Sequence, residues 1–406
     1  MTTKINNEHK KVYVPNSTDR GNVIRNVPHL RFPEFEGEWE DFLINDVCSE
    51  FKSGKNIKAD SISESGEYPV YGGNGLRGYT SSYNHEGLYV LIGRQGALCG
   101  NVRSVHGKTF ITEHAIAVAG NEISNTSFLH YLFVKMNLGQ YSDQSAQPGL
   151  AVNKLLKIKV VLPSVSEQTK IARFLSLLDE RITTQNKIID KLQSLIKGLE
   201  DNLLDNPLWE KTYLRSFMQF FSTNSLSWEQ LSYEEGEIRN LHYGLIHGFQ
   251  TRGINSASLP MIKNEAVPKQ YISCQVGDVA FADASEDTGE IAKSVEFVDT
   301  IEGNTICGLH TIHGRDIKNR TVVGFKGFAF NSRYFHNQIK RLAQGTKVFS
   351  ITANNLSSCY VYLPDLETQK AIVKLLKAYE AQLIVSRKTL KQYEKQKQYL
   401  LRQMFI

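Results

Sequence analysis

The sequence predicts an α+β protein in which two mostly β domains are separated by two long antiparallel coiled-coil helices, with an internal pseudo-two-fold repeat. The first observation behind this prediction is a duplication. The stretch VVLPSVSEQTKIARFLSLLDERI, from Val160 to Ile182, returns without a gap as VYLPDLETQKAIVKLLKAYEAQL, from Val361 to Leu383. The spacing between the two copies, from Val160 to Val361, is much longer than the period of a solenoid repeat, which is roughly 20 to 50 residues. It therefore marks a duplicated domain-plus-helix module. The other two observations are a heptad pattern after each Leu-Pro and Gly-rich, alternating segments before it.

The repeat divides the 406 residues into five parts. We expect a disordered N-terminal tail (1–27), a first β-rich domain (28–164), a first long helix (165–206), a second β-rich domain (207–364) and a second long helix (365–406). The tail, which begins MTTKINNEHKKVYVPNSTDRGN, is polar and lacks the apolar core of a signal peptide. No apolar run approaches the ~20 residues needed to cross a bilayer, so we expect a cytoplasmic protein without a membrane partner.

Charge and cysteine content narrow the possible partners. The net charge is +5, and the segment from Asp365 to Ile406 holds nine Lys or Arg against four acids. Such a basic surplus suggests an anionic partner, although a solvated helix face explains a run of this kind more often.

The five cysteines are scattered, with no CxxC pair and an odd total, which argues against a disulfide framework and against a zinc site. We therefore predict no metal.

Both helices carry a heptad seam that should bury one helix face against a partner helix. The seam positions are Ile171, Leu175, Leu178, Ile182, Ile189 and Leu192 in the first helix, and Ile372, Leu376, Leu383 and Leu390 in the second. Ser166 or Asp365 can cap the helix starts. An antiparallel pair is the plainest arrangement; the alternative is that each helix packs only on its own domain. The polar seam positions Gln185, Ser386 and Lys397 are interpreted as register or partner-choosing residues.

The segments before the helices have the chemistry of strands and turns. In the first domain, apolar alternation broken by Gly and Asn predicts a mostly β, twisted sheet with small helices, one of them over Ser127–Leu138. In the second domain, Trp228-Glu229 is matched with Trp39-Glu40 as the entry to the first strand. The run that starts at Gly277 is matched with the run that starts at Gly87, as a strand, a polar loop and a return strand.

No catalytic motif is convincing. Ser53-Gly54-Lys55 lacks the leading Gly of a phosphate loop, and Gly73-x-Gly75 lacks the third Gly of a dinucleotide site. His242 and His247 have no further ligand at metal spacing. The sequence therefore predicts a binding protein without catalytic residues.

Side chains suited to reading DNA are frequent on the Gly-rich loops. Arg and Lys bind guanine edges or phosphates, and Asn and Gln can pair with adenine. The candidate DNA-binding residues are Lys55, Asn74, Arg77, Tyr79, Arg94, Gln95, Arg103 and Gln147 in the first domain, and His242, Tyr243, Gln250, Arg252, Arg315, Lys318, Arg320, Arg333, Arg341 and Lys347 in the second.

The order of a domain, an LP-x-x-x-E-Q-x-x-I-A-x-x-L helix, a second domain and an LP-x-x-E-x-Q-x-x-I helix resembles the specificity subunit of Type I restriction-modification enzymes. The openings PHLRFPEFEGEWE and YPVYGGNGLRGY look like its target-recognition domains. The resemblance implies that each domain reads one half of a bipartite, asymmetric site on double-stranded DNA, and that the helices set the spacing. It also implies docking of two methyltransferase (modification) subunits and, for restriction, of motor-nuclease subunits. S-adenosylmethionine, ATP and Mg²⁺ would belong to those partners, and this chain would contribute no cofactor of its own.

Two other functions are compatible with the sequence. One is a self-contained restriction endonuclease or methyltransferase with a diverged active site, which would act on DNA without added subunits. The other is a coiled-coil adaptor whose end domains bind protein, which would fail to bind DNA at any salt concentration.

Overall fold

The computed structural model describes residues 26–143, 148–249, 251–299 and 305–406. Within these, the chain forms two compact units: the described residues of 26–184 with 390–406, and those of 185–389. The expected disordered tail lies outside the described residues except for Asn26 and Val27, and Asn26 is hydrogen-bonded through its carbonyl to the Trp39 N–H at 2.8 Å. No helix in the described ranges is long and apolar enough to span a membrane.

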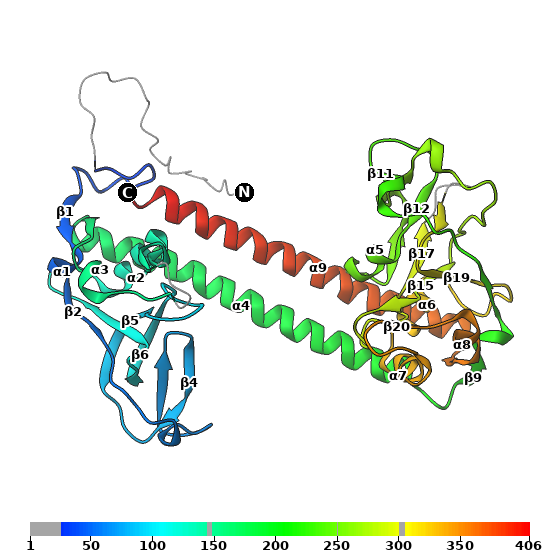
Figure 1. Cartoon of the computed structure of the whole chain (residues 1–406), viewed down its shortest axis with the longest axis horizontal. Helices are drawn as coiled ribbons and strands as arrows, with labels where there is room; N and C mark the ends of the chain where they lie inside the picture. Colours follow the sequence, from blue (N-terminus) through cyan, green and yellow to red (C-terminus); the bar gives the residue numbers. More distant parts are fainter. Residues whose placement is uncertain (1–25, 144–147, 250, 300–304) are drawn as a thin grey trace, which may run out of the picture. The chain divides into compact units, whose positions relative to one another are not determined.

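The first unit is a mostly antiparallel sheet with short helices and parts of both long helices (Figure 1). Its elements are β1 (Glu40–Leu43), α1 (Ile44–Val47), β2 (Cys48–Ser53), β3 (Tyr68–Gly72), β4 (Gly75–Thr80), β5 (His85–Gly93), β6 (Val102–Ile111), β7 (Ala115–Gly120), α2 (Thr126–Met136), α3 (Val152–Leu155), β8 (Lys159–Leu162), the start of α4 (Val165–Leu204) and the end of α9 (Leu366–Gln403). Six strands are ordered β2-β7-β5-β6-β3-β4, and β1 pairs separately with β8.

The second unit has the same plan with more, shorter strands. Its elements are β9 (Glu210–Tyr213), β10 (Met218–Phe221), β11 (Leu231–Ser232), β12 (Arg239–Leu241), α5 (Tyr243–Gly248), β13 (Gly253–Asn255), β14 (Met261–Ile262), β15 (Val279–Ala282), β16 (Ala284–Ser285), β17 (Ser294–Asp299), β18 (Thr305–Cys307), β19 (Thr311–Asp316), α6 (Phe325–Ala329), α7 (Arg333–Leu342), β20 (Phe349–Ser350), α8 (Ala353–Ser358) and β21 (Tyr360–Leu363). Five strands are ordered β10-β19-β15-β17-β13 and four more β11-β14-β12-β18.

Strand pairing shows how the two plans correspond. The last strand before each long helix is antiparallel to the first strand of its unit, β8 with β1 and β21 with β9. The parallel pair of β3 with the end of β6 corresponds to the parallel pair of β12 with β18, so β17 and β18 together take the place of the long strand β6.

The match of Trp39-Glu40 with Trp228-Glu229 is wrong. Glu210 begins the strand equivalent to β1, so the counterpart of Trp39 is Trp209.

The repeated glutamine near the start of each long helix fixes that helix to its domain. Gln168 is fully buried; its Nε2 donates to the carbonyls of Pro163 at 2.8 Å and Ile123 at 2.9 Å, and its Oε1 accepts from the Asn125 N–H at 2.8 Å. Gln369 repeats this arrangement with the carbonyls of Pro364 and Arg320 and the N–H of Val322, each at 3.0 Å. The glutamine that the two copies share, Gln168 in one and Gln369 in the other, is therefore a repeated side-chain anchor.

The helix caps differ partly from expectation. Asp365 caps α9, because its Oδ1 accepts from the Thr368 N–H at 2.9 Å. Ser166 is not the cap of α4. Ser164 takes this role instead, with its carbonyl accepting from the Gln168 N–H at 2.9 Å and its hydroxyl 3.4 Å from the Glu167 nitrogen.

In each unit, α4 and α9 pack against each other with opposite directions. In the first unit, Leu175 and Leu178 share a core with Leu400 and Met404, and Asp179 forms an ion pair with Lys397. In the second unit, the end of α4 shares a core with the start of α9, and Gln185 Nε2 donates to the Ser386 carbonyl at 3.2 Å. The polar seam positions are therefore paired across the helices, which is the register role expected of them.

The predicted seam is buried along both helices. Ile171, Leu175, Leu178, Ile189, Leu192, Ile372, Leu376 and Leu383 are each less than one tenth exposed, whereas Ile182 and Leu390 are half-buried. The alternative in which each helix packs only on its own domain is wrong, since residues of α4 and α9 share each core.

Candidate nucleic-acid interface

In the first unit, several strand ends meet at a set of backbone hydrogen bonds, which we call the first node. The Arg94 N–H donates to the His114 carbonyl at 2.9 Å, and the Arg94 carbonyl accepts from the Leu150 N–H at 2.9 Å. The Thr112 N–H donates to the Tyr71 carbonyl at 2.9 Å. The node therefore joins the end of β5, the turn before β7, the end of β3 and the segment before α3.

Predicted DNA-binding side chains surround the first node. Lys55 forms a bridge with Thr112, the turn between β3 and β4 carries Asn74, and Arg77 follows in β4; all three predicted residues are exposed. Arg94 is half-buried and Gln95 is exposed, with its Oε1 at 3.3 Å from His114 Nδ1. Residues from three parts of the sequence thus contribute cations and amides to one surface.

Glycine is required where the β3–β4 turn approaches Arg103. Gly75 has a φ of +110°, and a Cβ at this position would lie 2.4 Å from Arg103 Nη1. The guanidinium of Arg103 therefore packs directly on the turn and supports it. Tyr79 lies further along β4, where its backbone pairs with Ser63. Gln147 lies outside the described residues.

The second unit forms an equivalent node, which we call the second node, with the same three hydrogen bonds. The Asp283 N–H donates to the His310 carbonyl at 3.1 Å, and the Asp283 carbonyl accepts from the Ile351 N–H at 2.9 Å. The Gly308 N–H donates to the Leu241 carbonyl at 2.8 Å. Asp283 and His310 therefore hold the positions that Arg94 and His114 hold in the first unit.

The side chains at the second node are unlike those at the first. Asp283 Oδ1 lies 3.1 Å from His310 Nδ1, so a carboxylate–imidazole pair replaces the arginine. The short helix α5 replaces the tight β3–β4 turn, and Tyr243 on this helix lies edge-to-face against His310 with ring centroids 5.3 Å apart. His242 is buried and caps α5 by accepting from the Gly244 N–H, so it positions Tyr243 and has little exposed surface of its own. The two nodes share a scaffold and differ in chemistry.

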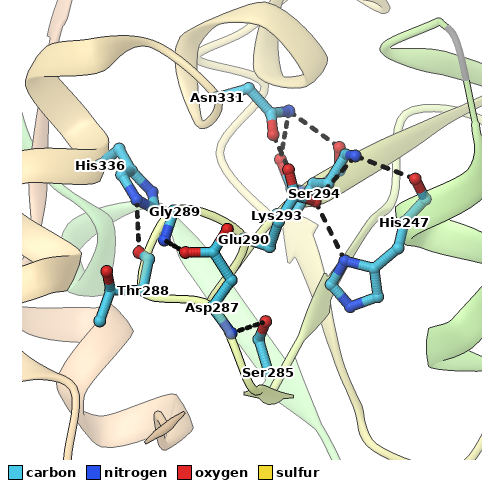
Figure 2. A network of polar contacts seen from close by, with 10 residues as sticks. All are labelled: His247, Ser285, Asp287, Thr288, Gly289, Glu290, Lys293, Ser294, Asn331 and His336. Atoms are coloured by element: carbon cyan, nitrogen blue, oxygen red, sulfur yellow. Dashed lines mark hydrogen bonds and ion pairs between the residues drawn. The ribbon is translucent and has the colours of Figure 1, made fainter. Parts of the chain in front are cut away.

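A polar network holds the loop that follows the second node (Figure 2). Lys293 Nζ contacts Glu290 Oε2 at 2.9 Å and the His247 carbonyl at 3.1 Å, and His247 Nδ1 lies 3.1 Å from the same Glu290 oxygen. Burial alone would raise the pKa of Glu290, but the bonds to Lys293 and His247 outweigh it and lower this pKa. The charged form of Glu290 is thus the one that the network favours.

The rest of this loop is fixed by its own turns. The Asp287 carboxylate accepts from the Gly289 N–H at 2.7 Å, the Asp287 N–H donates to Ser285 Oγ at 3.1 Å, and the ring of His336 on α7 bonds to the Thr288 carbonyl at 2.9 Å (Figure 2). The loop is therefore preorganised next to the second node.

Three of the predicted DNA-binding arginines have partners within the second unit. Arg315 forms two hydrogen bonds to Asp278, at 2.8 and 2.7 Å, and Arg320 pairs with Glu210 at 2.6 Å. The backbone N–H of Arg252 donates to Glu380 at 3.2 Å, and its Nε lies 3.8 Å from Glu200. These contacts give structural roles to the three residues, and their DNA contacts stay predictions.

The remaining predicted residues of the second unit are exposed. Lys318, Arg333, Arg341 and Lys347 lie on the loop after β19, on α7 and on the loop before β20. Ser350 of β20 pairs with both Ala284 and Gln344, which brings Arg341 and Lys347 into the neighbourhood of the second node. Gln250 lies outside the described residues.

Sequence reasoning missed His114, Asp283 and His310. One signal was available: in both units a His-x-Ile run, HAI and HTI, leads into the strand that lies second from the edge of the sheet, β7 or β19. Asp283 carries no such signal, because its role depends on hydrogen bonds between distant strand ends.

Glu380 is expected to make the stability of the second unit depend on pH. Burial raises the pKa of Glu380, whereas the hydrogen bond from the Arg252 N–H and the positive charge of Arg252 lower it. The effect of burial is the larger one, and the pKa rises from the ordinary 4.5 to about 7. Between these two pH values the folded chain keeps a proton that the unfolded chain has released, so the free energy of unfolding falls as pH rises through this window, by on the order of 3 kcal/mol. The Glu380→Gln variant should lose most of this fall and be the more stable protein above neutral pH.

Urea denaturation at about pH 5 and about pH 8 measures this effect. Glu394→Gln, which changes an exposed carboxyl on the same helix, is the control and should keep the parent's pH dependence. An unchanged pH dependence in the Glu380→Gln variant would contradict the assignment.

The structure thus defines a class of protein: a duplicated α+β chain in which each β-rich domain presents a node of unlike polar side chains and is anchored to paired long helices. A family model described as the Type I restriction modification DNA specificity domain matches residues 36–194 and 258–395, more than half of the chain. The chain therefore belongs to this family, and the resemblance identified in the sequence is confirmed.

Individual relatives agree with this assignment. A stretch of 165 residues is 41% identical to the Type I restriction enzyme EcoprrI specificity subunit of Escherichia coli and spans 40% of each chain. The Type I restriction enzyme MjaVIII specificity subunit of Methanocaldococcus jannaschii is 26% identical over 92% of both chains. The crystal structure of the Type I restriction-modification S subunit from M. genitalium superposes with a TM-score of 0.65 and 15% identity, over 94% of this chain and 99% of that one, which confirms the fold class.

Proposed function

We propose that this chain is the DNA-specificity subunit of a Type I restriction-modification complex, with each β-rich domain reading one half of a bipartite, asymmetric site. The observation that carries the proposal is the pair of nodes, which share three backbone hydrogen bonds but present Arg94 in one and Asp283 in the other. In the major groove, arginine bonds to guanine and a carboxylate accepts from the amino group of cytosine. Two nodes of this kind suit different half-sequences.

In this proposal the long helices set the distance between the half-sites and dock two methyltransferase subunits, with motor-nuclease subunits joining for restriction. Catalysis then belongs to the partners, together with S-adenosylmethionine, ATP and Mg²⁺, and the complex acts in the bacterial cytoplasm. Family membership supports this division of labour.

The proposal is tested by mapping methylated bases in host DNA with and without this chain, in cells that carry the methyltransferase subunits. We expect methylation at one split sequence only when the chain is present, and no methylation or cleavage by the purified chain alone. Activity of the purified chain on DNA would favour a self-contained enzyme instead.

Lengthening the helices should change the gap between the half-sites without changing the half-sequences. One heptad inserted near Gln185, with a matching heptad near Ser386, extends the pair by about 10 Å, or about three base pairs of DNA. Methylation mapping measures the new gap. Alanine replacement of the exposed residues Lys187 and Lys191 is the control and should leave the gap unchanged. Recognition of new half-sequences, or an unaltered gap, would contradict the spacing role.

A further inference from the structure

Two cysteines and a histidine meet inside the second unit although they are far apart in the sequence. Cys274, Cys307 and His313 are all buried, and their potential ligand atoms lie within 4.8 Å of one another. The two sulfur atoms are 3.5 Å apart. This cluster was not foreseen, because the cysteines are 33 positions apart and form no CxxC motif.

The histidine is held in the way that metal-binding histidines are held. His313 Nε2 lies 2.7 Å from Asp278 Oδ2, and Asp278 is itself bound by Arg315 and by the Gln275 N–H at 2.8 Å. A carboxylate behind an imidazole fixes the orientation of the ring and raises its basicity as a ligand.

The number and type of ligands suit zinc. Zn²⁺ takes thiolate and imidazole ligands in tetrahedral geometry, and with Zn–S bonds of about 2.3 Å two thiolates of one ion lie about 3.8 Å apart. The observed sulfur separation is within a few tenths of an ångström of this value. Cys307 and His313 also line a hollow of about 330 Å³, with Asn224 and Tyr271 on its wall, which provides a path for the ion and room for a fourth ligand.

We propose that Cys274, Cys307 and His313 bind one Zn²⁺, with a water molecule from the hollow as the fourth ligand. On binding, the two thiol protons are released to solvent. The ion links β18 of the four-stranded sheet to β19 of the five-stranded sheet. Because β18 pairs in parallel with β12, which leads directly into His242 and α5, the metal also secures the second node.

Metal titration of the full-length chain tests the site. The chain is purified under reducing conditions, stripped with a chelator, desalted and titrated with Co²⁺ and then Zn²⁺. We expect one Co²⁺ per chain with the thiolate charge-transfer and tetrahedral d–d absorption bands, and displacement of the Co²⁺ by Zn²⁺. Because loss of a supporting residue alone typically lowers metal affinity about 10- to 100-fold, the ligand variants Cys274→Ser, Cys307→Ser and His313→Gln should lose at least about 100-fold.

Cys359→Ser is the matched control, since Cys359 is another buried free cysteine of the same unit and lies outside the cluster. It should bind Co²⁺ like the parent chain. Circular dichroism checks that each variant is folded. A variant that does not fold is replaced by a measurement on the parent chain: Zn²⁺ should protect Cys274 and Cys307, but not Cys359, from alkylation mapped by mass spectrometry.

Three results would overturn the proposal: a reduced parent chain with free thiols that shows no Co²⁺ bands, metal binding that survives both cysteine variants, or a mass lower by two hydrogens that identifies a Cys274–Cys307 disulfide. None of these measurements involves DNA, so a failure of the zinc site is distinguishable from a failure of the proposed function.

Discussion

Replacing Lys55, Arg77 and Arg94 together with alanine is expected to weaken DNA binding by about a thousandfold or more. The three side chains surround the first node and come from three separate segments of the first unit. Hydrogen bonds that involve a charged group contribute about 1.5–3 kcal/mol each, and 1.4 kcal/mol is a factor of ten in affinity. Three lost contacts therefore remove at least about 4 kcal/mol.

The salt dependence shows whether these cations contact phosphates. Each lost phosphate contact should reduce the slope of log affinity against log salt by about 0.9. Fluorescence anisotropy with the split sequence found by methylation mapping, over a series of salt concentrations, measures both affinity and slope. The exposed Lys108, opposite Glu86 at the far end of the β5–β6 pair, provides the control variant Lys108→Ala. If the triple variant binds no more weakly than this control, the first node is not the DNA-binding surface.

Replacing Lys326 with methionine is expected to lower the free energy of unfolding of the second unit by about 3–5 kcal/mol. Lys326 is 2% exposed, and its Nζ lies 3.0 Å from Oε1 of Glu296, whose side chain is fully buried. The contact is an ion pair more than a well-aligned hydrogen bond, since Glu296 Oε1 lacks a hydrogen-bond partner. Methionine fills a similar volume but leaves the carboxylate without its counter-ion.

A double-mutant cycle separates the loss of the ion pair from the loss of packing. In the Lys326→Met/Glu296→Gln variant no unpaired charge is buried, and the amide oxygen of the introduced glutamine can still accept from the Gly327 N–H, which donates to Glu296 at 2.8 Å in the parent chain. The double variant should therefore recover part of the lost stability. Urea denaturation measures Lys326→Met, Glu296→Gln and the double variant, with Lys340→Met, an exposed position on α7, as the control. A Lys326→Met effect no larger than that of the control would show that the buried pair is energetically neutral.

The sequence predicted what depends on local periodicity. The heptad seams specify two long helices, and the repeated Leu-Pro specifies their starts, because the capping groups and the heptad pattern of each helix lie close together in the chain. The polar seam residues Gln185 and Ser386 were also correctly read as a pair-forming feature, since their hydrogen bond lies on the seam itself.

The sequence could not predict what depends on distant strand ends. The equivalence of Arg94 with Asp283 exists only through hydrogen bonds to residues many positions away, and in the second unit the long strand β6 is divided into β17 and β18, which shifts the spacing of every motif around it. The wrong choice of Trp228 in place of Trp209 has a similar cause, because only the pairing of β9 with the distant strand β21 shows that Glu210 begins the strand equivalent to β1. The cysteines are far apart in the sequence, and for this reason no metal site was predicted. In the folded chain, however, strand pairing brings Cys274 and Cys307 together.

The glutamine anchors have a consequence for how new variants of this protein arise. Each anchor needs only two carbonyls and one N–H from its domain, groups that every polypeptide backbone carries regardless of its side chains. A foreign β-rich domain that ends in Leu-Pro at the right position can therefore be joined by genetic recombination to an existing helix and still fold. Whole β-rich domains can therefore be exchanged without any change in the sequence of the two long helices.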